Sequence, residues 1–162
     1  MEIPQRLAHL PVCPRRNVPV PYANITTEDG QHDFTALDSA KVVRLAAERR
    51  CGICEDTLDY WIVFLGGERS AQSRAYTDPP MHEECARFAA RTCPYVTRAH
   101  MSRRKTPLTP DTTVPKGFSE DKPAEFLLYF TRSYKHQVTR DGVLFRPAPA
   151  VRLERCGYSA AS

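Results

Sequence analysis

Two pairs of metal-binding residue types constrain this chain more than any other feature of its sequence. Cys51 and Cys54 form a CxxC pair, and His82 and Cys85 form an HxxC pair after a gap of 27 residues. A tight turn aims the two sulfurs of a CxxC at one point, and residues three apart in a helix project from the same side. Thiolate and imidazole ligands suit tetrahedral zinc, whereas iron–sulfur clusters usually take four cysteines. The sequence therefore predicts one zinc ion bound by four side chains, Cys51, Cys54, His82 and Cys85.

The order of the two pairs predicts a fold around the metal. A loop with the first pair, then strands, then a helix with the second pair is the order of a treble-clef zinc finger. Asp38 or Ser39 can cap a helix before Cys51, and Asp78 can cap a second helix that has Pro79 at its first position. The apolar run "DYWIVFLGG" between them is typical of a strand that ends in a turn. We predict an α+β fold, with a treble-clef-like zinc site and two helices packed on short antiparallel strands.

Turn residues and composition divide the chain further. Asp29-Gly30 and Asp141-Gly142 are typical of hairpin turns between short strands. The stretch from Thr97 to Lys122 is rich in Pro, Thr, Ser, Lys and Arg, which is typical of a linker. We expect a single domain over 1–162, made of an irregular N-terminal arm at 1–21, a zinc-binding core at 22–96, a flexible basic linker at 97–123 and a C-terminal β-hairpin at 124–156.

The other three of the six cysteines have no paired neighbour. Cys93 would lie roughly 16 Å from His82 along an unbroken helix, at about 1.5 Å per residue, so it cannot bind the same ion. Cys13 and Cys156 are expected to be buried or unreactive. The first residues lack the basic and apolar regions of a signal peptide, and no apolar run is long enough to span a membrane. We expect a cytoplasmic protein without disulfides.

Three kinds of enzyme share parts of this pattern. A thioredoxin-like redox pair lies where a strand leads into a helix, whereas here the predicted helix precedes Cys51. Zinc deaminases leave one zinc position open, whereas Cys85 is available to close this site. HNH nucleases use the same treble clef and need a histidine base before the helix, but residues 55–81 contain no histidine. An HNH-like nuclease therefore stays an alternative in which His82 would have to act as the base.

Basic residues suggest an anionic partner. The net charge is +4, which permits binding to nucleic acid without requiring it. A basic run follows the second predicted helix, and its side chains are candidate phosphate contacts: Arg98, Arg103, Arg104 and Lys105. The strand-like stretch "YFTRSYKHQ" offers Tyr129 or Tyr134 as a stacking ring for bases, and alternation would leave the other ring in the core.

Several stretches of the chain resemble a family of small proteins from actinobacteria and their phages, with the motif CxxC … PPxHxxCAxxA. The matching residues are "RLAHLPV" and "TDPPMHEECARFAARTCPY", with a weaker likeness in "FTRSYKHQVTRDGVLFR". The resemblance implies a zinc-finger-like metal site and a phage or mobile-element setting, and it implies no activity.

Our leading hypothesis is a non-enzymatic, zinc-dependent binding module that contacts nucleic acid or the host's nucleic-acid machinery. We assign no catalytic residue, no small-molecule substrate and no membrane partner. The alternatives are an HNH-like metal-dependent nuclease and a small protein-binding inhibitor whose zinc is structural. The sequence does not distinguish DNA, RNA and protein as partners, and it leaves the oligomeric state open.

Overall fold

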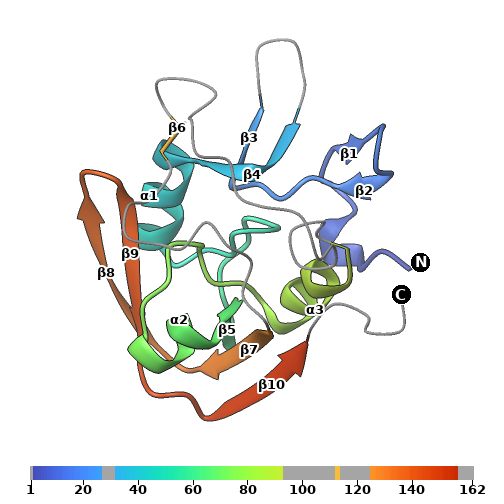
Figure 1. The fold of residues 1–162 in the computed structure, drawn as a ribbon. Coiled ribbons are helices and arrows are strands. Elements are labelled where there is room, and N and C mark those ends of the chain that lie inside the picture. Colours follow the sequence, from blue (N-terminus) through green and yellow to red (C-terminus); the bar gives the residue numbers. More distant parts are fainter. Residues whose placement is uncertain (1, 27–31, 93–111, 114–124, 157–162) are drawn as a thin grey trace.

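The computed structural model describes residues 2–26, 32–92, 112–113 and 125–156, with backbone alone at 32–35 and 112–113. Small antiparallel sheets and a few helices make up this part of the chain, in agreement with the predicted α+β class (Figure 1). None of the described helices is long and apolar enough to cross a membrane.

One three-stranded antiparallel sheet contributes to both apolar clusters of the fold. Its middle strand is β7 (Phe126–Thr131), with β5 (Ile62–Gly67) on one side and β10 (Arg152–Cys156) on the other. Every residue of β7 is buried, so both faces of this strand must be covered. Strands buried on both faces read as continuous apolar runs rather than as alternating patterns, which explains the sequence "FLLYF".

The sheet separates two apolar clusters. Successive residues of a strand point to opposite faces, and β5 accordingly contributes Val63 to one cluster and Phe64 to the other. In β7, Phe130 joins the first cluster and Tyr129 joins the second. The first cluster also contains Cys51, Cys54 and Cys85, so we call it the metal-side core. The second is dominated by aromatic rings, and we call it the aromatic core.

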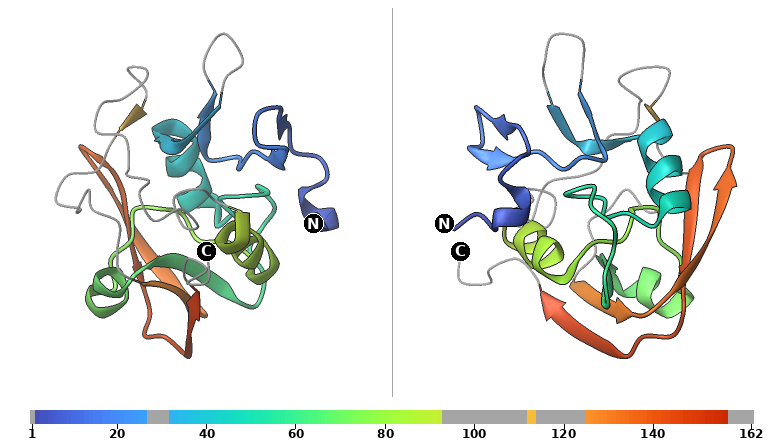
Figure 2. Two further views of the ribbon diagram at one scale, coloured as in Figure 1. Left: turned by 45° about the vertical axis from the view of Figure 1, so that its right-hand side comes forward. Right: turned by 180° about the vertical axis from the view of Figure 1, so that it is seen from behind.

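The first predicted helix is confirmed. Helix α1 (Ser39–Glu48) is capped by the Asp38 side chain, which accepts hydrogen bonds from the backbone N–H groups of Ala40 and Lys41. Its buried side chains are Val42, Leu45 and Ala46. They pack into the aromatic core, beside the hairpin formed by β8 (Tyr134–Thr139) and β9 (Gly142–Pro147) (Figure 2).

Further short strands complete the sheets. The pair β8–β9 turns at Arg140 and Asp141, one residue before the predicted Asp141-Gly142. Strand β3 (Asn24–Thr26) pairs with β4 (His32–Asp38), and the predicted turn at Asp29-Gly30 lies outside the described residues. Near the N-terminus, a 3-10 helix η1 (Gln5–Leu7) precedes the pair β1 (Val12–Cys13) and β2 (Val18–Pro19). Strand β6 (Thr112–Thr113) pairs with β4.

Two expectations about the segment after β5 are wrong. The strand leads directly into a short helix, α2 (Glu68–Ser73), where the glycines predicted only a turn. Helix α3 (Glu83–Thr92) begins at Glu83 instead of Pro79. The cause is a tertiary contact: the backbone of Met81 exchanges hydrogen bonds of 3.0 and 2.8 Å with Val63, so Met81 is held extended beside β5.

Candidate metal centre

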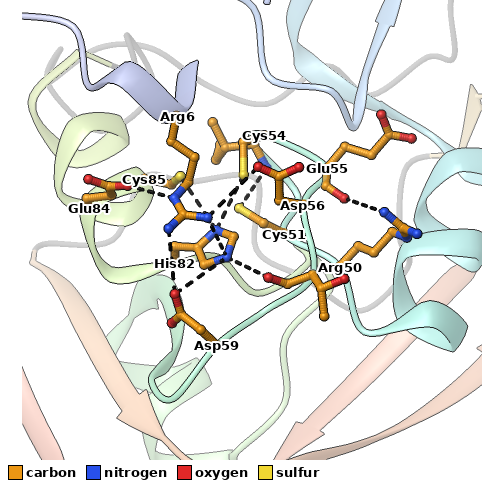
Figure 3. A network of polar contacts seen from close by, with 12 residues as sticks. Arg6, Arg50, Cys51, Cys54, Glu55, Asp56, Asp59, His82, Glu84 and Cys85 are labelled. Carbon is orange, nitrogen blue, oxygen red and sulfur yellow. Dashed lines mark hydrogen bonds and ion pairs between the residues drawn. The ribbon is translucent and has the colours of Figure 1, made fainter. Parts of the chain in front are cut away.

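The structure brings the four predicted ligands together. Cys51 and Cys54 lie in the loop after α1, His82 directly precedes α3, and Cys85 lies in its first turn. All four residues are buried, and one potential ligand atom from each lies within 4.8 Å of the other three (Figure 3). We call this group the Cys3His cluster. The protein positions it to hold a metal ion.

A tight loop aims the first two sulfurs. The N–H of Glu55 donates to the carbonyl of Cys51 at 3.0 Å, and the N–H of Cys51 donates to the carbonyl of Asp56 at 2.8 Å. Glu55 has a φ of 74°, a left-handed conformation that turns the chain back on itself. The N–H of Ile53 points at the sulfur of Cys51 at 3.4 Å, a contact that stabilises a thiolate.

Glycine is required at position 52 because the loop is pressed against the segment that leads into α3. A Cβ at Gly52 would lie 2.5 Å from Cγ of Pro79, closer than carbon atoms approach without moving. The N–H of Gly52 donates to the carbonyl of Pro80 at 2.9 Å. This close approach holds the CxxC loop and the His82 segment at a fixed separation.

A hydrogen bond sets which nitrogen of His82 faces the cluster. Nε2 lies 2.8 Å from the carbonyl oxygen of Thr57, which can only accept, so Nε2 carries the proton. The unprotonated Nδ1 then lies 3.4 Å from the sulfur of Cys54 and 3.9 Å from that of Cys85. Anchoring the remote ring nitrogen in this way is the usual arrangement of a metal-binding histidine.

The spacing of the donor atoms fits a tetrahedral ion. With Zn–S bonds of about 2.3 Å and Zn–N bonds of about 2.0–2.1 Å, a sulfur and a nitrogen on one tetrahedron lie about 3.5 Å apart, by geometry. The 3.4 and 3.9 Å contacts of His82 Nδ1 bracket this distance.

The buried thiols depend on one another for their protonation. Burial by itself would raise the pKa of Cys51, but hydrogen bonds from the thiols of Cys54 and Cys85 lower that pKa well below its ordinary value. The pKa of Cys85 is raised instead. The largest cause is its hydrogen bond to Cys51, and its hydrogen bond to Cys54 and its burial add to the effect. Three thiols this close cannot all ionise without a cation, because their charges repel one another in a dry site. A divalent metal supplies that charge.

The N-terminal segment lies over the cluster, which the sequence did not indicate. Arg6, in η1, donates from Nε to Glu84 at 2.6 Å, and its other nitrogens lie 3.9 Å from Asp56 and 3.7 Å from Asp59. Its Nη1 is also 3.3 Å from Nε2 of His82. Both of these atoms carry protons, so that contact is a close approach rather than a hydrogen bond.

Apolar contacts hold this segment in place. Leu7 and Leu10 are buried in the metal-side core, and His9 Nε2 lies 3.1 Å from the carbonyl of Cys54. Leucines three residues apart in "RLAHL" were the one signal of this docking, and they were obscured by the prolines around them. The N-terminal segment is therefore part of the metal site.

We predict that Arg6 strengthens metal binding. A divalent ion with three thiolates and one neutral histidine leaves a net charge of −1, and the Arg6 guanidinium offsets part of it. Arg6→Met keeps most of the side-chain packing and should weaken metal affinity about 10- to 100-fold, the usual effect of losing a supporting contact around a metal. Competition with a chelator measures the affinity. Arg6→Lys should lose less, and equal affinity in Arg6→Met and the unaltered protein would contradict this role.

Other predicted site residues are not brought to the cluster. Cys93 and the basic run Arg98, Arg103, Arg104 and Lys105 lie outside the described residues. Tyr129 and Tyr134 are both buried, so the interpretation that one of them offers a surface for bases is wrong. Tyr134 donates its hydroxyl to the carbonyl of Ala46 at 2.9 Å and serves the core.

Comparisons of the chain with models of protein families, with curated protein sequences and with solved structures gave no match. The resemblance to small actinobacterial and phage proteins thus stays a prediction. Function is inferred below from the Cys3His cluster and from the charged surfaces of the described residues.

Proposed function

We propose that this chain is a non-enzymatic binding module, built around one zinc ion in a treble-clef-like site, and that its partner is nucleic acid. The observation that carries the proposal is the burial of four protein donor atoms around a single point. Sites of this kind are structural, because the protein itself supplies every ligand.

The donor types favour zinc over other metals. Three sulfurs and one imidazole nitrogen match a Cys3His zinc site. Magnesium and calcium require oxygen ligands, which the cluster lacks. Zinc also has no geometric preference from its d electrons, so it accepts the tetrahedron that the protein imposes.

The chain path supports a treble-clef-like arrangement. The CxxC loop closes with an antiparallel bridge between Arg50 and Thr57. The chain then runs through β5, returns with Met81 hydrogen-bonded to Val63, and enters α3, whose first turn carries Cys85. This is a loop, a hairpin-like return and a helix, with α2 inserted into the return.

A closed site supports binding rather than hydrolysis. A catalytic zinc keeps one position for water, whereas here a fourth protein ligand is in place to fill it. His82 directs Nδ1 to the cluster and Nε2 to a backbone carbonyl, so neither nitrogen is free to act as the base of an HNH-like nuclease.

Charge supports nucleic acid as the partner. The chain carries a net charge of +4 and has a pI of about 8.8. Positive surface charge supplies most of the sequence-independent affinity of proteins for nucleic acid.

The proposal is tested by three assays on one preparation. We expect about one equivalent of zinc per chain by elemental analysis, salt-sensitive retardation of a DNA duplex or a single strand in gels, and no cleavage of either with added magnesium or manganese. Cleavage by the unaltered protein that is lost in His82→Ala would contradict the proposal and favour an HNH-like nuclease. Zinc binding without retardation at any salt concentration would leave a structural zinc and a protein partner.

A further inference from the structure

The β8–β9 hairpin presents one polar face to solvent. Its register pairs Lys135 with Arg146 and Gln137 with Leu144. Side chains alternate along each strand, so the buried Tyr134, Val143 and Phe145 define the inner face. The opposite side, which we call the outer hairpin face, consists of Lys135, Gln137, Thr139, Leu144 and Arg146.

Two like charges face each other on the outer hairpin face. Lys135 and Arg146 are directly opposed partners in the register, and both are exposed. Cβ atoms of such partners lie about 4.5–5.5 Å apart, and like charges in this position destabilise a sheet. An anion lying between the two cations would remove this repulsion.

These cations lack the partners that many arginines of the protein have. Arg44 pairs with Glu48, Arg87 with Glu83 and Glu154, and Arg152 with Glu154. Within the described part of the chain, Lys135, Arg140 and Arg146 make no such ion pair. The charges of Lys135 and Arg146 are therefore not neutralised by an ion pair among the described residues.

We infer that the outer hairpin face binds the phosphate backbone of nucleic acid. This inference rests on the proposed function and assigns its contact surface. Lys135 and Arg146 would contact phosphates, with Arg140 beside them at the turn. Gln137 adds an amide hydrogen-bond donor, a group that commonly bonds to phosphate oxygens, whereas the hydroxyl of Thr139 already donates to the carbonyl of Gly142 at 2.8 Å.

The make-up of the face favours nucleic acid over a protein partner. The centre of a protein–protein interface is enriched in aromatic residues and depleted of charge. The outer hairpin face has the opposite character, with one half-buried leucine among polar and basic side chains. Its polar residues recur at every second position, about 6.8 Å apart along the strand, a repeat comparable to the spacing of phosphates on one strand.

The hairpin is anchored from its inner side, so its outer side chains can be changed without unfolding it. Phe145 exchanges backbone hydrogen bonds of 3.0 and 2.7 Å with Tyr76, and the Tyr134 hydroxyl is tied to α1. Arg49 lies over the ring of Tyr134 at 4.6 Å. None of these contacts involves Lys135 or Arg146.

The test is a salt titration of binding to a short DNA duplex by the full chain. Lys135→Ala/Arg146→Ala should weaken binding and make the slope of log affinity against log salt shallower, by roughly 0.9 where the two cations share one phosphate and by roughly 1.8 where each contacts its own. The control variant Arg15→Ala/Arg69→Ala removes the same charge from two other exposed positions, between β1 and β2 and in α2. It should leave the slope almost unchanged.

The outcomes distinguish a failure of the hairpin assignment from a failure of the proposed nucleic-acid partner. Equal effects of the two double variants would overturn the hairpin assignment and leave nucleic-acid binding intact, carried by diffuse charge. Absence of duplex binding by the unaltered protein would overturn the proposed partner as well. Binding to polyglutamate that matches the duplex and is lost in the hairpin variant would reassign the face to an acidic peptide. Zinc content should be the same in all variants.

Discussion

Chelation of the metal should unfold the metal-side core. Zinc binding contributes about 10 kcal/mol or more to folding in small zinc-finger peptides, because the unfolded chain has no preformed site. Here the three cysteines of the Cys3His cluster lie within the same buried group as Val63 and Phe130, which belong to β5 and β7. Loss of the ion should therefore reach β5 and β7 as well as the CxxC loop. Thermal unfolding monitored by circular dichroism, before and after verified removal of zinc, measures the effect.

Substitution of a single ligand should act in the same way. Cys85→Ser removes a fully buried sulfur from the first turn of α3 and should abolish stoichiometric zinc binding. Cys156→Ser is the matched control, because Cys156 is also a free cysteine but lies in β10, outside the cluster. If Cys85→Ser retained its zinc and its melting temperature, the assignment of Cys85 as a ligand would be contradicted.

Phe64→Ala should destabilise the other side of the sheet without altering the metal site. Phe64 is completely buried in the aromatic core, and its ring centroid lies 4.8 Å from that of Tyr76, 6.0 Å from that of Phe145 and 6.1 Å from that of Tyr134. Truncation of a buried phenylalanine costs about 3–5 kcal/mol, including the cavity that it leaves. Denaturant unfolding in zinc-containing buffer should show this loss.

Two comparisons make the Phe64→Ala prediction specific. Val138→Ala alters an exposed residue of β8 and should change the free energy of unfolding by no more than about 0.5 kcal/mol. Zinc stoichiometry in folded Phe64→Ala should stay at one, because Phe64 points away from the metal-side core. A loss of zinc from the folded variant would show that the two cores are not separated by the sheet.

The chemistry of short segments explains what the sequence predicted well. The Asp38 cap and the buried side of α1 depend on residues within one or two helical turns, and the Asp-Gly pair located the β8–β9 turn to within one residue. The Cys3His cluster could be predicted equally well from the sequence, because zinc ligands must be of a few residue types at short spacings. These features carry their signal in neighbouring residues.

Contacts between distant segments explain the features that the sequence did not predict. Pro79 favours a helix start, but hydrogen bonds between Met81 and Val63 delay α3 to Glu83. The contacts of Arg6 with Asp56, Asp59 and Glu84 join parts of the chain that only the fold brings together. Tyr134 lies in a strand whose other residues are exposed, yet α1 covers its ring. Local pattern contains no information about such packing.

X-ray absorption at the zinc edge of the purified protein tests the central claim most directly. A closed Cys3His site predicts three sulfur atoms at about 2.3 Å, one nitrogen at about 2.0–2.1 Å and no water oxygen in the first shell. The same spectrum should be obtained with and without bound DNA, because a metal with four protein ligands would have no position for a substrate. A first shell with fewer than three sulfurs, or with an oxygen ligand that changes on binding, would contradict the structural role of the site.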